Sequence, residues 1–277
     1  MTGYAGVVTR LHTTSYGESG SRVVFLHGLF GQGRNWTTPA RAIAGRHRVT
    51  LVDLPDHGRS EWTERLDYVE MADTVAELLE SLGGASDPVD LVGHSMGGKT
   101  AMLAALRHPS LVARLMVVDI APVAYASASE FARYVSALQG LDLARLRDRD
   151  EADAQLATAV PSETVRSFLL QNLRRAKLPD GSDGWAWQPN LAVIGRDLGA
   201  LSGWPAEAAG AVPPYAGPTL WVAGERSDYI RPEYDGAMRA LFPHYRKVTV
   251  KGAGHWVHSE QPETFLQILR TFLGDAA

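Results

Sequence analysis

The chain has 277 residues with a formal net charge of −4, and 45% of its residues are hydrophobic. This length fits one large α/β domain or two small ones, and the weak negative charge argues against a nucleic-acid partner. Cysteine is absent, which excludes disulfides, thiolate metal sites and a cysteine nucleophile.

The N-terminal stretch MTGYAGVVTRLHTTS lacks the apolar core of a signal peptide. No apolar run along the chain approaches the length that spans a bilayer. We therefore expect no membrane association and a cytoplasmic protein.

Four short apolar runs punctuate the first half of the chain, at 23–26, 49–52, 89–92 and 115–118. None of them alternates polar with apolar residues. Continuous valine-rich runs of this length are typical of strands buried on both faces of a parallel sheet.

Helical patterns lie between these runs. Residues 67–82 predict a helix with a capping box at Asp67 and Glu70 and a stop at Gly83. A second helix is expected from about 95 to 108. Alternating strands and helices predict an α/β protein with a mostly parallel, doubly wound sheet.

The alternation stops after Pro122 and resumes near residue 212. The interval 123–211 has no comparable buried strand and instead predicts helices at about 128–147, 149–159 and 161–176, followed by the Trp-rich stretch DGWAWQPNL. We interpret it as a helical cap, or lid, inserted into a core domain made of 1–122 and 212–277.

The second part of the core returns to strand and helix order. Strands are predicted at 218–222 and 246–250, with a helix at 232–241 between them. The last helix carries apolar residues at helical spacing, namely Phe265, Ile268, Leu269, Phe272 and Leu273.

The stretch GHSMGGKT at 93–100 satisfies two catalytic patterns. It matches G-x-x-x-x-G-K-[ST], the phosphate-binding loop, and Asp119 after the next strand could then hold magnesium. This interpretation, a nucleotide binder, leaves the other motifs of the chain unused. We keep it as a remote alternative.

The same stretch matches G-x-S-x-G, the nucleophile turn of a serine hydrolase. A serine at the tip of a sharp strand–helix turn has positive φ, and glycines at 93 and 97 remove the side chains that it would crowd. Met96 then opens the helix, so its N–H can serve an oxyanion beside Ser95.

Two further strand ends carry complementary motifs. FLHGLFG at 25–31 offers Leu29 N–H as the second oxyanion donor, with His27 ordering the loop. GAGHWVHSE at 252–260 follows the last strand, and His255 is the expected general base. His258 is expected to be structural or at the pocket rim, and His94 lies inside the turn.

The acid that would orient His255 has two candidates. Asp119 ends the strand at 115–118, and Asp228 follows the strand at 218–222. Neighbouring parallel strands lie about 4.8 Å apart, so either strand end can reach the same histidine. These residues alone leave the choice open.

The strings HGLFGQGRNW, DLPDHGRS, GHSMGGKTAM, VVDIAPV and GAGHWVHSEQP resemble the α/β-hydrolase superfamily, in particular the YbfF-type bacterial esterases and their eukaryotic abhydrolase relatives. The resemblance implies an α/β-hydrolase fold, Asp119 as the acid and Ser227 as an auxiliary residue beside His255. It also makes Asp53 and His57, in DLPDHGRS, structural.

The insertion is expected to cover the carboxyl ends of the strands and to shape an apolar pocket. Its aromatic residues are divided between that pocket and the insertion's own core: Tyr125, Phe131, Tyr134, Phe168, Trp185, Trp187 and Trp204. The implied substrates are small carboxylic esters or acyl thioesters of short to medium chain, and no metal or organic cofactor is needed.

Two other outcomes stay open on the same fold. A cofactor-free lyase, cyclase or C–C hydrolase would keep the serine site for a specialised metabolite, and a binding module would retain it without activity. The oligomeric state is not indicated.

Overall fold

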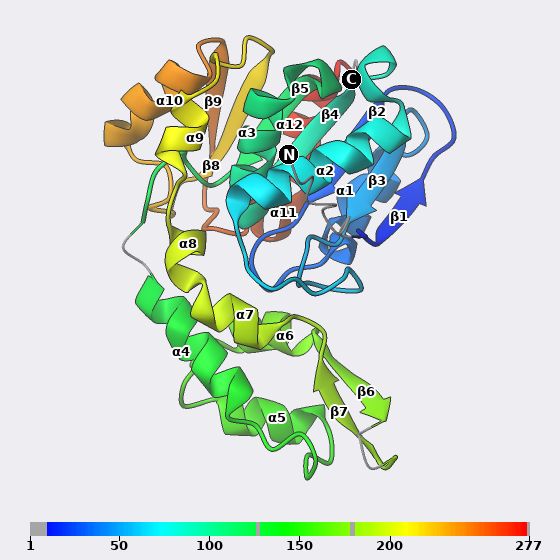
Figure 1. Ribbon diagram of the computed structural model, residues 1–277, viewed down its shortest axis with the longest axis vertical. Coiled ribbons are helices and arrows are strands. Elements are labelled where there is room, and N and C mark those ends of the chain that lie inside the picture. Colours follow the sequence, from blue (N-terminus) through cyan, green and yellow to red (C-terminus); the bar gives the residue numbers. More distant parts are fainter. Residues whose placement is uncertain (1–9, 126–127, 178–180, 276–277) are drawn as a thin grey trace, which may run out of the picture.

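The computed structural model describes residues 10–125, 128–177 and 181–275 (Figure 1). A seven-stranded sheet has the order β1-β3-β2-β4-β5-β8-β9, and only β1 runs antiparallel to its neighbour. The strands are β1 (Thr13–Tyr16), β2 (Arg22–Leu26), β3 (Arg48–Val52), β4 (Val89–His94), β5 (Val112–Val118), β8 (Thr219–Gly224) and β9 (Tyr245–Val250). The predicted parallel sheet is confirmed.

Helices cover both faces of this sheet. One face packs on α2 (Tyr68–Leu82), α3 (Met96–Arg107) and α10 (Asp235–Leu241). The other packs on α1 (Thr37–Ile43) and α12 (Pro262–Leu273). The remaining core elements are α11 (Val257–Glu260) and the 3₁₀ turns η1 (Gly33–Trp36), η2 (Gly84–Ser86), η3 (Pro109–Leu111) and η4 (Pro232–Tyr234).

Side-chain alternation explains the continuous apolar runs. Along β2, Val24 and Leu26 enter the cluster on the α2–α3 face, while Val23 and Phe25 enter the cluster on the α1–α12 face. All four side chains are fully buried. Because both faces of a central strand are covered, no polar position interrupts its sequence.

Three helices or strands of the core were not predicted, and one cap differs from its prediction. β1 is a four-residue edge strand, α1 a seven-residue helix and α11 a four-residue helix, all too short to show a clear period. At the start of α2, Asp67 caps Val69 and Glu70 N–H as expected. Glu70 does not complete the capping box, because its carboxylate pairs with Arg65 instead.

Residues 128–210 form a group of short elements that lies beside the carboxyl ends of the strands (Figure 1). We call residues 123–211 the helical segment. It contains α4 (Ala128–Gln139), α5 (Arg149–Leu156), α6 (Glu163–Leu170), β6 (Leu173–Lys177), β7 (Asp183–Trp187), α7 (Leu191–Arg196), α8 (Leu198–Ser202) and α9 (Ala206–Gly210).

Two of the predicted helices in this segment are too long. The helix expected over 128–147 ends at Gln139, before Gly140. The helix expected over 161–176 ends at Leu170, and 173–177 instead pair antiparallel with 183–187 as a two-stranded hairpin. Indole N–H groups of the hairpin bind backbone carbonyls of the segment, Trp185 to Leu146 and Trp187 to Leu138. These tertiary bonds hold a strand where local pattern suggested helix.

The greater part of the helical segment begins and ends at nearly the same point. Tyr125 N–H donates to Ser202 C=O at 2.9 Å, which brings these two residues together, and α9 follows before the chain enters β8. Asn190 and Asn172 attach the segment to the core elsewhere, through Asp56 Oδ1 and Phe30 C=O respectively. No helix among the described residues is both long and apolar enough to cross a membrane.

Candidate active site

Ser95 lies at the sharp junction between β4 and α3. Its backbone has φ 53° and ψ −119°, a conformation that side chains rarely adopt. A Cβ atom at Gly93 would lie 2.3 Å from Gly97 C=O, and one at Gly97 would lie 2.6 Å from Leu26 C=O. Only glycine fits at these two positions, so the turn has the geometry that the motif predicts.

His255 is hydrogen-bonded to Asp119. Its Nδ1 lies 2.8 Å from Asp119 Oδ2, and Asp119 is fully buried at the end of β5. Asp119 Oδ1 accepts a second bond from Gly224 N–H at 2.9 Å. Asp228, the other candidate acid, has an 89% exposed side chain near Arg231. Of the two carboxylates, Asp119 is therefore the one that contacts the histidine.

Ser227 also binds the Asp119 carboxylate. Its hydroxyl donates to the same Oδ2 atom that accepts from His255. Ser227 Oγ in turn accepts from Tyr229 N–H at 3.3 Å. The serine that the resemblance placed beside His255 thus acts on the acid rather than on the imidazole.

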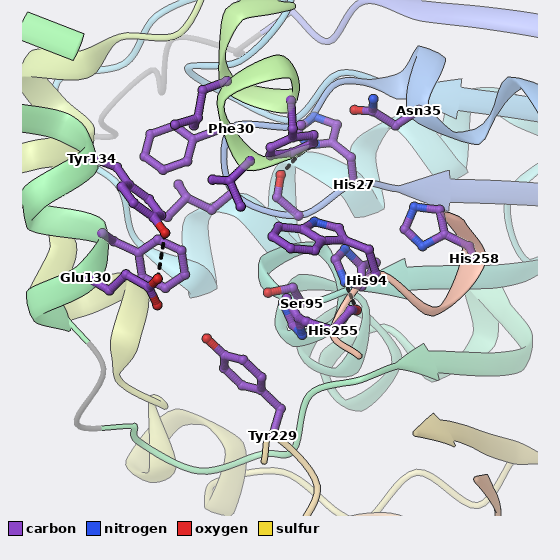
Figure 2. Close-up of a pocket in the computed structure, with 18 of the residues that line it drawn as sticks. His27, Phe30, Asn35, His94, Ser95, Glu130, Tyr134, Tyr229, His255 and His258 are labelled. Atoms are coloured by element: carbon purple, nitrogen blue, oxygen red, sulfur yellow. Dashed lines mark hydrogen bonds between the residues drawn. The ribbon is translucent and has the colours of Figure 1, made fainter. Parts of the chain in front are cut away.

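Ser95 and His255 line one pocket, and their side chains lie next to each other in it (Figure 2). Across the described ranges, Ser95 Oγ has no hydrogen-bond partner. A hydrogen bond between a serine hydroxyl and a neighbouring histidine is often long in an unliganded site and tightens only when substrate is present. The Tyr229 ring stacks on the His255 ring, with centroids 4.2 Å apart. No sequence motif pointed to Tyr229, which lies in the irregular loop after β8.

The pocket has a volume of about 300 Å³ and mostly apolar walls. The core contributes Leu29, Phe30, Trp36 and Trp256, and the helical segment contributes Phe131, Tyr134, Val165, Phe168 and Leu169. Among the aromatic residues singled out in the sequence, Phe131, Tyr134 and Phe168 line this pocket. Trp185 and Trp187 bond within the segment instead, as the expected division allows.

Two backbone N–H groups near Ser95 are free of protein acceptors. In the described part of the chain, neither Leu29 N–H nor Met96 N–H donates a hydrogen bond. Met96 is buried and opens α3, so its N–H adds to the positive end of that helix. Leu29 and Ser95 line the same pocket. A developing negative charge on a substrate oxygen is the partner that such groups suit.

The loop carrying Leu29 is ordered by His27. Its Nδ1 donates to Gly28 C=O at 2.8 Å, while its Nε2 accepts from Leu54 N–H at 2.9 Å. The ring must be neutral, because Nε2 can accept only when it carries no proton. Burial, helped by the nearby His57, lowers the pKa of His27 to about 3.

The other pocket histidines are held in place by the protein. His94 Nε2 donates to His255 C=O at 2.9 Å, which ties the nucleophile turn to the histidine loop. His258 stacks on Trp36 with centroids 4.2 Å apart, and burial lowers its pKa to about 3. Among the described residues, neither His94 nor His258 forms an ion pair with a carboxylate.

Two residues of DLPDHGRS orient backbone, as expected. Asp53 accepts from Gly33 N–H at 2.6 Å and from Arg59 N–H at 2.9 Å. His57 Nδ1 donates to Pro55 C=O at 2.9 Å.

Lys99, the lysine of the phosphate-loop pattern, is almost fully buried with 1% exposure. Its Nζ donates to Ser202 C=O at 3.1 Å and to Gly203 C=O, at the end of α8. The rings of Tyr125 and Tyr68 flank the ammonium, with centroids 4.8 and 5.5 Å away. Burial lowers the pKa of Lys99 to about 7. Because the Lys99 ammonium binds carbonyl groups of the helical segment, it is not available to bind a nucleotide phosphate.

No group of three or more His, Cys, Asp or Glu side chains could hold a metal ion within the residues that the structure describes.

The chain is similar to proteins of one family throughout its length. A family model described as the alpha/beta hydrolase fold matches residues 21–262. The sn-1-specific diacylglycerol lipase ABHD11 of Mus musculus is 38% identical over 257 residues, which are 91% of this chain and 80% of that protein. Esterase YbfF of Escherichia coli is 29% identical over 96% of this chain and 98% of its own length.

A solved structure is also similar to this chain in its fold. A marine microorganism esterase superposes with a TM-score of 0.88 at 33% sequence identity, covering 95% of this chain and 99% of that one. The similarity therefore includes the helical segment as well as the sheet.

Proposed function

The chain belongs to the α/β-hydrolase family, and from this premise we propose that it hydrolyses carboxylic esters with Ser95, His255 and Asp119 as a catalytic triad. Ester hydrolysis is the activity carried in the names of its esterase and lipase relatives. The observation that carries the proposal is the bond from His255 Nδ1 to buried Asp119, in the pocket that Ser95 lines.

The proposed reaction is acyl transfer in two halves. Ser95 Oγ attacks the ester carbonyl carbon while His255 Nε2 accepts its proton. The tetrahedral oxyanion receives the N–H groups of Leu29 and Met96. The C–O bond to the alcohol then breaks, and His255 returns the proton to the leaving oxygen. Water attacks the acyl-enzyme by the same route and releases the acid.

Asp119 fixes the tautomer of His255. A carboxylate on Nδ1 leaves Nε2 free to accept a proton, and it stabilises the imidazolium that forms. Gly224 N–H and Ser227 O–H hold that carboxylate in place. The Tyr229 ring, stacked on His255, restricts the imidazole plane.

The helical segment is proposed as a cap that forms the acyl wall of the pocket. Its Phe131, Val165 and Phe168 face the site together with core residues. A volume of about 300 Å³ is at the small end of ligand pockets. We propose uncharged esters or acyl thioesters of short to medium chain as substrates.

Replacement of the nucleophile tests the proposal. Ser95→Ala should lower the turnover of p-nitrophenyl butyrate by about 10⁴-fold or more and abolish labelling by a fluorophosphonate probe. Ser167→Ala, an exposed serine of α6, is the matched control and should keep both. Full turnover by a folded Ser95→Ala protein, checked by circular dichroism, would overturn the assignment.

A further inference from the structure

A groove separate from the active-site pocket is lined by four arginines. Arg34 and Arg59 come from the sheet core, and Arg149 and Arg174 come from the helical segment. The groove has a volume of about 570 Å³, and its other lining residues are Gly58, Gln171, Leu173 and Gln188. The described residues that line it include no Asp or Glu.

These four side chains share one concavity and lack counterions among the residues that the structure describes. None of them forms an ion pair with any residue in the described ranges, whereas Arg22, Arg107 and Arg114 each pair with an aspartate at 2.6–2.8 Å. The chain as a whole is acidic, with a net charge of −4. Four like charges facing one concavity raise the local potential and attract anions.

Two of the guanidinium groups are fixed in place. Arg34 Nη2 donates to Gln171 C=O at 2.7 Å, and Arg149 Nη2 donates to Leu173 C=O at 2.5 Å. The side chains of Arg59 and Arg174 have no hydrogen-bond partner among the described residues. The groove thus combines two anchored guanidinium groups with two that are free to close on a ligand.

Gln171 fixes the wall between two of the arginines. Its C=O accepts from Arg34, and its Oε1 accepts from Asn35 Nδ2 at 2.9 Å. Gln171 lines the groove, so this wall is held by bonds to the core.

We propose that this groove binds a phosphate group, best as a pyrophosphate or phosphomonoester of a small molecule or lipid headgroup. Guanidinium groups match phosphate oxygens in pairs, and several together favour a multiply charged anion over a carboxylate. The carboxylates of Asp150, Asp153 and Glu163 line the adjoining groove beyond Arg149. They confine the anion to the side of Arg34, Arg59 and Arg174.

Binding there would join the two parts of the molecule. The anion contacts the core through Arg34 and Arg59 and the helical segment through Arg149 and Arg174. A ligand that binds only the folded state stabilises it by mass action. Pyrophosphate should therefore raise the thermal unfolding midpoint. This inference does not depend on the proposed ester hydrolysis.

Titration calorimetry with inorganic pyrophosphate at low ionic strength tests the site. The double variant Arg59→Ser/Arg174→Ser should weaken binding at least about tenfold, because it removes two charged donors to the phosphate oxygens. The matched control is Arg246→Ser, on β9 at the opposite edge of the sheet, and it should bind like the parent. An unchanged circular dichroism spectrum and an unchanged thermal unfolding midpoint in the absence of ligand show that the double variant is folded.

A second arm identifies the source of the phosphate. Sedimentation with phosphatidylcholine vesicles, with and without phosphatidic acid, is compared for the parent and the double variant. Arginine-dependent binding of pyrophosphate alone identifies a soluble ligand, and arginine-dependent binding of phosphatidic acid vesicles identifies a lipid headgroup. Absence of saturable binding in both arms, or equal binding by the double variant, overturns the inference.

Discussion

The sheet core and the helical segment are built from different elements. The central strands of the core are buried on both faces and joined by continuous ladders. The segment consists of short helices and a hairpin whose buried side chains join the hydrophobic cluster of the α2–α3 face, and polar bonds such as those from Asn172 and Asn190 add to this attachment. Strand ends of the core position the serine, histidine and acid, whereas the segment supplies pocket wall. Ser95, His255 and Asp119 thus all come from the core, and the segment completes the wall around the pocket.

The largest effect is expected from replacement of Asp119, the buried carboxylate of the core. Asp119→Asn should reduce kcat on p-nitrophenyl butyrate by about 10⁴-fold, because an amide at this position favours the wrong tautomer of His255. Asp228→Asn, an exposed neighbour in the loop after β8, should retain activity. The reverse pattern would move the acid from β5 to β8 and refute the triad.

Acid should destabilise the core through its buried histidines. All nine histidines lie outside 123–211. Burial lowers the pKa of His27 and of His258 to about 3, and it also lowers the pKa of His57 and His94. Between pH 6.5 and 3 the unfolded chain binds protons that the folded chain excludes. Stability is therefore intact above pH 6.5 and falls as the pH drops.

The acid effect is measured by urea unfolding at a series of pH values. His27 alone, with a pKa lowered by between three and four units, accounts for a loss of up to about 5 kcal/mol near pH 3. The exposed His244 is the control, and His244→Gln should leave the pH dependence unchanged. A urea midpoint that stays constant from pH 7 to pH 4 would contradict burial of neutral histidines.

Lys99 tests the attachment between the two parts. Lys99→Met removes the donors to Ser202 and Gly203 C=O and leaves buried acceptors unpaired. The expected loss of unfolding free energy is about 2–4 kcal/mol. Lys247→Met, an exposed lysine of β9, is the control. If Lys99→Met unfolds at the same urea concentration as the parent and the control, Lys99 does not hold the segment.

Replacement of a pocket-lining residue of the helical segment should change the preference for ester chain length, and this is the smallest of the expected effects. Phe168 of α6 lines the pocket and packs against Trp256 of the core, with ring centroids 5.8 Å apart. Phe168→Ala should lower kcat/KM for p-nitrophenyl octanoate by about five- to tenfold and leave the acetate ester little changed. Ser167→Ala, its exposed neighbour, provides the comparison. An equal loss on both esters would indicate damage to the chemistry instead.

The same division explains what was predictable from sequence. Each central strand is buried on both faces, so its residues form an unbroken apolar run such as VVFL at 23–26. The glycines at 93 and 97 are dictated by close backbone contacts within the turn, so the motif at Ser95 carries its own geometry. Local sequence was sufficient wherever the constraint was local.

Other features depend on contacts that are distant in sequence. The strand at Leu173–Lys177 exists because it pairs with 183–187, and the indole bonds of Trp185 and Trp187 cannot be read from LRRAK. The choice between Asp119 and Asp228 needed the resemblance, since both follow neighbouring strands. The stacking of Tyr229 on His255 left no signal at all.

The meeting of Tyr125 and Ser202 has a consequence for how such enzymes diversify. Where a peptide leaves a scaffold and comes back to it at the same spot, everything between those points can be swapped or shortened without stretching the frame. A chimaera grafted at this junction should inherit the donor's substrate range while keeping the recipient's reaction, which makes residues 125 and 202 natural crossover points for engineering.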